Sequence, residues 1–249
     1  MKNNKSLGQH WLKNRIYLDQ IADAAVFEGV GTCLEIGPGL GTLTSSLLKR
    51  FERVVAIEFD QNLAKNHPKS FPGKNLTVIN EDILKFDLDS IEGDYSVAGN
   101  IPYYITSPII EKLLTAEHPP RQISLLIQKE VAERVADERE SVLSLFVKNQ
   151  AEVQLGPVVD RLEFTPPPKV DSQVLVLTPR PHPLIIPQAF KLVKIGFKNP
   201  RKKLISNLTS LKSKEELREI FTNLHLDENA RPSDLHLDDW SRLYSLLMH

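Results

Sequence analysis

The segment Gly99-Asn-Ile-Pro-Tyr-Tyr104 carries side chains suited to holding an aromatic amine at the end of an apolar run. The side-chain carbonyl of Asn100 can accept a hydrogen bond, and Pro102 stiffens the turn so that a backbone carbonyl points the same way. Two acceptors on the N–H bonds of an amine such as N6 of adenine favour a more pyramidal, more reactive nitrogen. The ring of Tyr103 offers a face for stacking on a base. A strand-end turn with a core tyrosine is the alternative.

A glycine-rich turn, Glu35-Ile-Gly-Pro-Gly-Leu-Gly41, lies between a predicted strand and a predicted helix. Glycines let the backbone approach a ligand, and the helix N-terminus presents free N–H groups. A dinucleotide fingerprint needs a glycine at position 42, where this chain has Thr42. The Gly-x-Gly-x-Gly spacing instead resembles motif I of S-adenosylmethionine (SAM) methyltransferases. A plain glycine turn is the alternative.

Two acids follow the next two predicted strands. Glu58 ends the second strand, where a carboxylate can accept hydrogen bonds from both ribose hydroxyls of either NAD or SAM. Asp82 follows the third strand and could accept from the adenine amino group of a cofactor. An acid at this place is not part of the dinucleotide fingerprint, so Asp82 favours SAM. An exposed acid and a turn aspartate are the alternatives.

The elements that must position these residues alternate along the chain. Short apolar runs are followed by helical patterns, which predicts βαβ units and a parallel sheet. The predicted strands are 33–36, 54–57, 76–79, 95–98 and 123–127, and the predicted helices 42–50, 61–67, 107–115 and 129–137. Residues 153–159 and 173–178 are strand-like with no helix between them, so we expect the sheet to end in an antiparallel pair.

Prolines mark a domain boundary near residue 180. Three prolines precede the last predicted strand and four follow it within a few residues, a spacing that no helix can cross. Beyond it only helical patterns occur, over 187–197, 201–211, 214–223 and 237–248. We therefore predict a catalytic domain over 1–180 and a small all-α domain over 181–249.

Composition excludes several classes of protein. The 249 residues carry a net charge of −1, which excludes a uniformly basic nucleic-acid coat protein. Residues 179–249 nevertheless hold 12 Lys or Arg against 8 Asp or Glu. A single cysteine, Cys33, excludes an intramolecular disulfide and fits a reducing cytoplasm. The sequence has no His/Cys cluster with metal-ligand spacing, no apolar run of membrane-spanning length and no secretory signal at its start.

Two basic runs are candidate contacts for a phosphate backbone. Lys198-Asn-Pro-Arg-Lys-Lys203 is the densest of them and precedes a predicted helix. The N-terminal run consists of Lys2, Lys5, Lys13 and Arg15. Solvated charge is the alternative for both.

Four segments resemble the rRNA adenine N6-dimethyltransferases, nearly end to end and in order. Asn100–Tyr103 is similar to motif IV of that family. The others are Leu7–Leu12, Phe164-Thr-Pro-Pro-Pro-Lys-Val-Asp-Ser172 and a C-terminal Arg231-Pro…Trp240…Leu243 pattern. Within the family the chain most resembles the small-subunit (KsgA) type. That resemblance implies a Rossmann-like, mostly parallel seven-stranded sheet with a small helical C-terminal domain.

The resemblance also implies roles for individual residues. Those expected at the cofactor are His10, Leu12, Gly37, Gly39, Glu58, Asp82 and Asn100, with Glu58 at the ribose and Asp82 at the adenine. Tyr103 and Phe164 would sandwich the target base, with Asn100 between cofactor and amine. Three positions depart from the pattern: His10 stands where Asn is usual, Trp11 where Phe is usual, and Tyr104 where Asn is common.

The implied activity is N6,N6-dimethylation of two adjacent adenines near the 3′ end of small-subunit (16S) rRNA, with SAM as methyl donor. Arg201, Lys202 and Lys203 would contact RNA, the partner being rRNA or a pre-30S particle and the enzyme a cytoplasmic monomer without metal. Three alternatives stay open: a large-subunit (23S) rRNA methyltransferase of the macrolide-resistance type, a non-catalytic relative acting as a transcription factor, and an NAD-dependent oxidoreductase.

Overall fold

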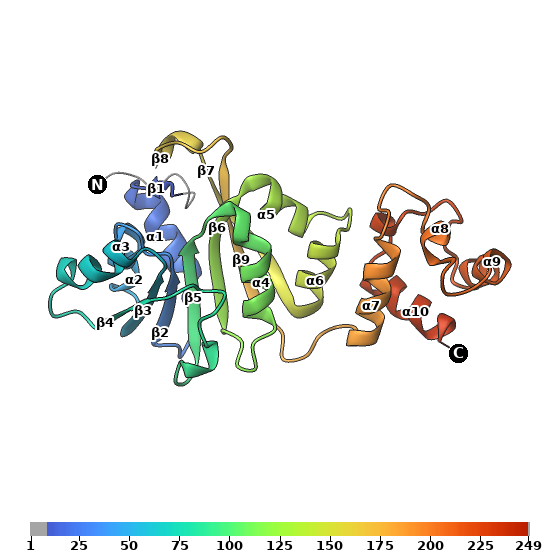
Figure 1. The fold of residues 1–249 in the computed structure, drawn as a ribbon, viewed down its shortest axis with the longest axis horizontal. Coiled ribbons are helices and arrows are strands. Elements are labelled where there is room, and N and C mark those ends of the chain that lie inside the picture. Colours follow the sequence, from blue (N-terminus) through green and yellow to red (C-terminus); the bar gives the residue numbers. More distant parts are fainter. Residues whose placement is uncertain (1–8, 249) are drawn as a thin grey trace. The chain divides into compact units, whose positions relative to one another are not determined.

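The computed structural model describes residues 9–248, and the chain divides into two compact units (Figure 1). The first unit comprises the chain up to Glu133 together with Glu152–Pro179, and the second comprises Arg134–Ala151 together with the chain from Arg180 onward. The later division lies between Pro179 and Arg180. The sequence prediction had placed Arg134–Ala151 in the first domain, whereas its contacts lie with the second unit.

The first unit is built on the expected mostly parallel seven-stranded sheet. Its strands are β2 (Thr32–Ile36), β3 (Arg53–Glu58), β4 (Leu76–Asn80), β5 (Tyr95–Asn100), β6 (Gln122–Gln128), β7 (Ala151–Val159) and β9 (Ser172–Pro179). Their spatial order is β4-β3-β2-β5-β6-β9-β7, and the pairings from β4 to β6 are all parallel. The last predicted strand, β9, lies between β6 and β7 and runs antiparallel to β6.

The register of the parallel strands brings four chain segments to one edge of the sheet. Ile36 at the end of β2 pairs with Ile57 on one side and with Gly99 on the other. Glu58 at the end of β3 pairs with Asn80 at the end of β4. The residues that follow these strands are therefore neighbours at the carboxyl edge, which is where open α/β sheets bind ligands.

Helices and a short second sheet complete the first unit. The helices α2 (Thr42–Leu47), α3 (Gln61–Asn66), α4 (Thr106–Leu114) and α5 (Lys129–Ala136) correspond to the predicted ones, and the division between the units falls within α5, after Glu133. Three elements of this unit were not predicted: the helix α1 (Arg15–Ala24), and the strands β1 (Trp11–Leu12) and β8 (Phe164–Thr165), which pair with each other. The side chain of Asn14 caps α1, and that helix buries Leu18 and Ile21 in the core.

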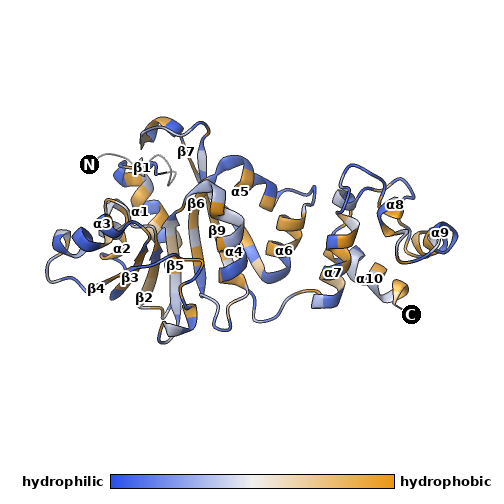
Figure 2. Cartoon of the chain, in the orientation of Figure 1, coloured by the Kyte–Doolittle hydropathy of each residue, from blue (hydrophilic) through white to orange (hydrophobic). Residues whose placement is uncertain are grey.

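The second unit is helical. Its helices are α6 (Val142–Gln150), α7 (Pro187–Gly196), α8 (Leu204–Leu208), α9 (Lys214–Asn223) and α10 (Leu237–Leu247). They share a core around the fully buried Trp240, and Leu145 of α6 belongs to the same cluster, which explains why this segment joins the second unit. Apolar positions recur along these helices (Figure 2). The predicted helix over 201–211 is shorter than expected, because Lys203 has extended backbone angles and α8 begins only after it.

Candidate active site

A pocket of about 240 Å³ opens at the carboxyl edge of the sheet in the first unit. Five segments line it: Gln9–Leu12, Ile36–Gly39, Ile57–Phe59, Glu81–Leu84 and Asn100–Ile105, with a few residues of α1 and α2. Every residue that the sequence assigned to the cofactor is in this lining, and so is Tyr103. The fold therefore brings together segments far apart in the sequence, such as those of His10 and Asn100, which are 90 residues apart and joined by a hydrogen bond.

The glycine-rich turn needs glycine for its backbone shape and for close approach. Gly39 has a φ of +56° and Gly41 a φ of +81°, values in the left-handed region that side chains disfavour. A Cβ on Gly39 would lie 3.3 Å from the indole nitrogen of Trp11, and one on Gly41 would lie 2.9 Å from the ring of His67. The turn thus packs against neighbours on both sides while its backbone lines the pocket.

Glu58 is held by the backbone at the end of β3. One carboxylate oxygen accepts from the N–H of Gly39 at 3.0 Å and the other from the N–H of Asp60 at 2.8 Å. Burial raises the pKa of Glu58 above its ordinary value, and these two hydrogen bonds partly oppose the shift. Each oxygen keeps a second lone pair, so the carboxylate can still accept hydrogen bonds from a diol such as ribose.

Asp82 follows the end of the neighbouring strand, β4. Its Oδ1 accepts from the backbone N–H of Leu84 at 3.0 Å, which fixes the side chain in a turn. That bond uses only one of the two carboxylate oxygens. Asp82 lines the pocket, so its second oxygen suits an amino group at this end.

Asn100 is oriented by the N-terminal segment. Its Nδ2 donates to the backbone carbonyl of His10 at 2.9 Å, so the amide nitrogen is engaged and the amide oxygen is the group left to accept from a ligand. The contact is made by the backbone of His10. It therefore does not depend on which side chain occupies position 10, where this sequence departs from the usual Asn.

His10 and Tyr103 form an aromatic surface beside Asn100. The Nδ1–H of His10 donates to the carbonyl of Pro166 at 2.8 Å, since a carbonyl oxygen can only accept. The His10 and Tyr103 rings are nearly parallel, at 19°, with centroids 6.2 Å apart. The Tyr103 hydroxyl is 2.7 Å from that of Ser172, and burial raises the pKa of Tyr103 while this bond opposes the rise. Both rings line the pocket.

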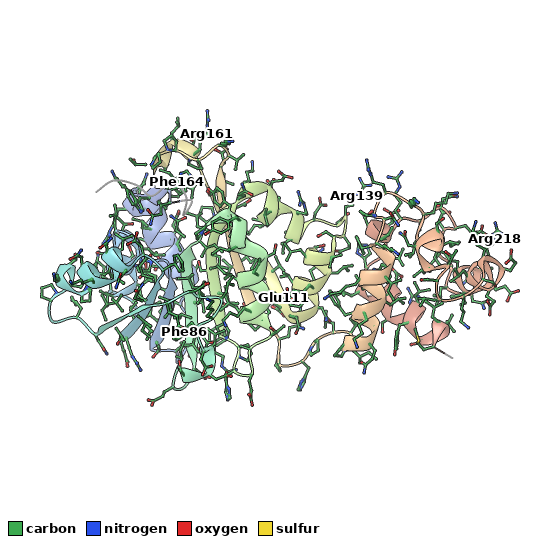
Figure 3. All side chains as sticks on the ribbon, in the orientation of Figure 1. Phe86, Glu111, Arg139, Arg161, Phe164 and Arg218 are labelled. Carbon is green, nitrogen blue, oxygen red and sulfur yellow. The ribbon has the colours of Figure 1, made fainter. Side chains whose placement is uncertain are left out.

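Phe164 does not contribute a face to this pocket. The residue is 2 % exposed and belongs to the core cluster that also contains Leu12 and Leu18. Phe164 pairs with Leu12 across β1 and β8, and Figure 3 labels it at this pair. The structure thus places Phe164 where it stabilises the contact between the N-terminal segment and the proline-rich loop, outside the lining of the pocket where the stacking role was expected.

Two residues in and beneath the site were missed by the sequence reasoning. Trp11 packs against Gly39, and the only signal for it was its position beside His10. Glu35, the first residue of the glycine-rich motif, is fully buried, and neither carboxyl oxygen has a hydrogen-bond partner among residues 9–248. Burial is the main cause that raises the pKa of Glu35 to about 8. An acid inside an apolar strand was the available signal for Glu35.

The basic runs lie in different units. Arg201, Lys202 and Lys203 are exposed in the second unit, just before α8. Arg15 is tied to α2 by hydrogen bonds to Thr42 and Ser45, whereas Lys2 and Lys5 lie outside the described residues. Among residues 9–248, no helix is long and apolar enough to cross a membrane, and no three His, Cys, Asp or Glu side chains are grouped as metal ligands.

Comparison with known proteins places the chain among RNA-modifying enzymes. The sequence matches the family described as ribosomal RNA adenine dimethylase over residues 1–249. A curated relative from Acaryochloris marina, named ribosomal RNA small subunit methyltransferase A, is 40% identical over 255 residues, covering 96% of this chain and 95% of the relative. The protein of the same name from Bacillus cytotoxicus is 36% identical over 265 residues, covering 98% of this chain and 91% of its own.

Two solved structures agree in fold. A dimethyladenosine transferase from Plasmodium falciparum has a TM-score of 0.81 at 29% identity, covering 94% of this chain and 96% of its own. The 23S rRNA methyltransferase ErmE has a TM-score of 0.79 at 27% identity, covering 96% of this chain and all of its own. These matches confirm the expected Rossmann-like methyltransferase fold with a helical C-terminal region. The protein belongs to the ribosomal RNA adenine dimethylase family.

Proposed function

We propose that this protein transfers methyl groups from SAM to the N6 amines of two adjacent adenines near the 3′ end of small-subunit (16S) rRNA, twice on each base. The observation that carries the proposal is the amide of Asn100, which is held through its nitrogen by the His10 carbonyl at 2.9 Å. That bond leaves the amide oxygen to accept an N–H of the target amine. An acceptor at this place suits a poorly nucleophilic aromatic nitrogen.

The other pocket residues suit the cofactor. Bound SAM would supply an electrophilic methyl group on its sulfonium. The Glu58 carboxylate would accept from the ribose hydroxyls, because both its oxygens face donors and retain lone pairs. Asp82 would accept from the adenine amino group, and Gly37 and Gly39 would let the backbone approach the methionine part. Leu12 and His10 would close the pocket through the N-terminal segment.

Positioning supplies most of the rate in this proposal. Asn100 and a backbone carbonyl of its turn would hold the amine in line with methyl and sulfur, a geometry that lowers the entropic part of the barrier. Tyr103 would stack on the target base, which has to leave any helical stack to enter the pocket. The hydrogen bond between the Tyr103 and Ser172 hydroxyls keeps that ring in one place.

The choice of small-subunit rRNA rests on the relatives. Proteins named small subunit methyltransferase A are 36% to 40% identical to this chain over nearly its whole length, whereas the 23S enzyme is 27% identical. Arg201, Lys202 and Lys203 would contact the phosphate backbone of the rRNA or of a pre-30S particle. In this proposal the protein acts as a monomer in the cytoplasm.

One experiment tests the proposal against its rivals. The protein is incubated with labelled SAM and with unmodified small or large ribosomal subunits, and the methylated adenines are mapped. We expect label on two adjacent adenines of the small subunit alone. Label on large-subunit rRNA would favour the macrolide-resistance type, and SAM binding or RNA binding without any transfer would favour a non-catalytic relative.

A further inference from the structure

Tyr104 is a large aromatic side chain that the fold leaves uncovered at the active site. It is 66 % exposed, yet it lines the same pocket as Asn100 and Tyr103. A residue that both lines the pocket and remains largely exposed lies at the pocket mouth. Its ring contributes little to the core, so packing does not account for an aromatic side chain here.

The backbone beneath Tyr104 is held firmly. Tyr103–Ile105 form one turn of 3₁₀ helix that follows Pro102, and the N–H of Ile105 donates to the carbonyl of Pro102 at 3.2 Å. Tyr103, the preceding residue, is anchored through its hydroxyl to Ser172 at 2.7 Å. The position of Tyr104 relative to the target-base site is therefore set by rigid neighbours, which reduces the entropic cost of using its ring for binding.

Two other exposed aromatic residues differ from Tyr104 in location. Phe59 is 63 % exposed and lines the pocket, but it follows Glu58 at the side assigned to the ribose and adenine of the cofactor. Phe27 is 38 % exposed and is not part of the pocket lining. Among these three residues, Tyr104 alone adjoins the side assigned to the substrate base.

We propose that the ring of Tyr104 is a stacking platform for the nucleobase next to the target adenine. The inference rests on the proposed function, in which the substrate carries two adjacent adenines. When one adenine enters the pocket, its neighbour loses a stacking partner and lies at the mouth, where an aromatic face can replace that partner. Stacking of a base on an aromatic side chain is tolerant of base identity, so the platform can accept whichever base lies on that one side of the reacting adenine.

The first test compares variants that keep or remove the aromatic face. Because Tyr104 is exposed, Tyr104→Leu is expected to fold normally. Its KM for RNA should rise about 5- to 150-fold, the range expected for loss of one base stack, with little change in kcat and none in SAM affinity. Tyr104→Phe and Tyr104→Trp should stay near wild type. Phe27→Leu is the matched control and should change none of these values.

The second test identifies the contacted nucleotide. Oligonucleotides carry the target adenine with an abasic site on its 5′ or its 3′ side, and wild type and Tyr104→Leu are compared on each. We expect one abasic site to raise the wild-type KM as much as Tyr104→Leu does and to have no further effect in that variant. Additive losses at both sites, or a Tyr104→Leu enzyme with unchanged KM, would overturn the proposal. Failure of the proposed function would differ, because wild type would then methylate no adenine of the small-subunit sequence.

Discussion

Replacing Glu35 by glutamine should change how stability depends on pH. The carboxyl group is fully buried near the end of β2, and its oxygens have no hydrogen-bond partner among the described residues. Burial raises its pKa from 4.5 to about 8, and the nearby charge of Glu58 adds to the rise. Hydrogen bonding from the side chain and backbone of Thr44 opposes the shift, but neither group reaches the carboxyl with full hydrogen-bond geometry, and the Thr44 hydroxyl is hydrogen-bonded to His67 at 3.0 Å.

The direction follows from proton linkage. The folded state binds the Glu35 proton more tightly than the unfolded state, so this group's contribution to stability is complete below pH 4.5 and is lost as the pH rises from there through about 8. One pKa unit corresponds to about 1.4 kcal/mol, so the loss between pH 5 and pH 8 is on the order of 3 kcal/mol. Glu35→Gln removes this dependence because the amide does not titrate.

The assay is urea unfolding of both proteins at pH 5, 6.5 and 8. Unfolding is followed by the hydrogen exchange of peptides from β2, so that the free energy obtained is that of the first unit alone. The amide introduced by the substitution changes the free energy of unfolding by the same amount at every pH. The test therefore uses only how the difference in this free energy between variant and wild type varies with pH. We expect the variant to gain stability relative to wild type as the pH rises. A difference that stays constant from pH 5 to pH 8 would show that Glu35 titrates at an ordinary value and would contradict the prediction.

Four further predictions concern the site and its surroundings. Glu58→Ala should weaken SAM binding by about 1.5–3 kcal/mol, measured by calorimetry on the folded variant. In wild type, SAM affinity should decline on acidification at a pH above the ordinary carboxyl range, because burial raises the pKa of Glu58. Asn100→Ala should slow single-turnover methyl transfer about 100-fold or more, as loss of a group that aligns and activates the amine, with SAM affinity measured separately. Replacing Arg201, Lys202 and Lys203 by Ala should lower the slope of log affinity against log salt for RNA by about 0.7 per lost single-strand contact, and an unchanged slope would identify the run as solvated surface. Phe164→Ala should lower the free energy of unfolding by about 3–5 kcal/mol, because it removes a buried ring. Phe164→Leu should keep most of the methyl-transfer activity, and a strong loss of transfer in a stably folded Phe164→Leu variant would instead support a stacking role.

The alternation of strands and helices from β2 to α5, and the residues at the carboxyl edge, could be predicted from the amino-acid sequence alone. Alternating apolar runs and helical patterns are local signals, and the rule that parallel strands end at one edge turns them into spatial neighbours. This is why Gly37, Glu58, Asp82 and Asn100 were predicted together and line one pocket. The spacing of the glycines likewise argued against a dinucleotide fingerprint, because that spacing is a property of the sequence itself.

The roles of the N-terminal segment and the proline-rich loop, by contrast, depend on the tertiary structure. The pairing of Leu12 with Phe164 and the bond from His10 to Pro166 join residues more than 150 positions apart, and no local pattern encodes such contacts. Burial is a property of the whole fold as well. The same aromatic and acidic side chains therefore become a core ring at Phe164, an open face at Tyr104 and an unpaired buried acid at Glu35, according to which elements cover them.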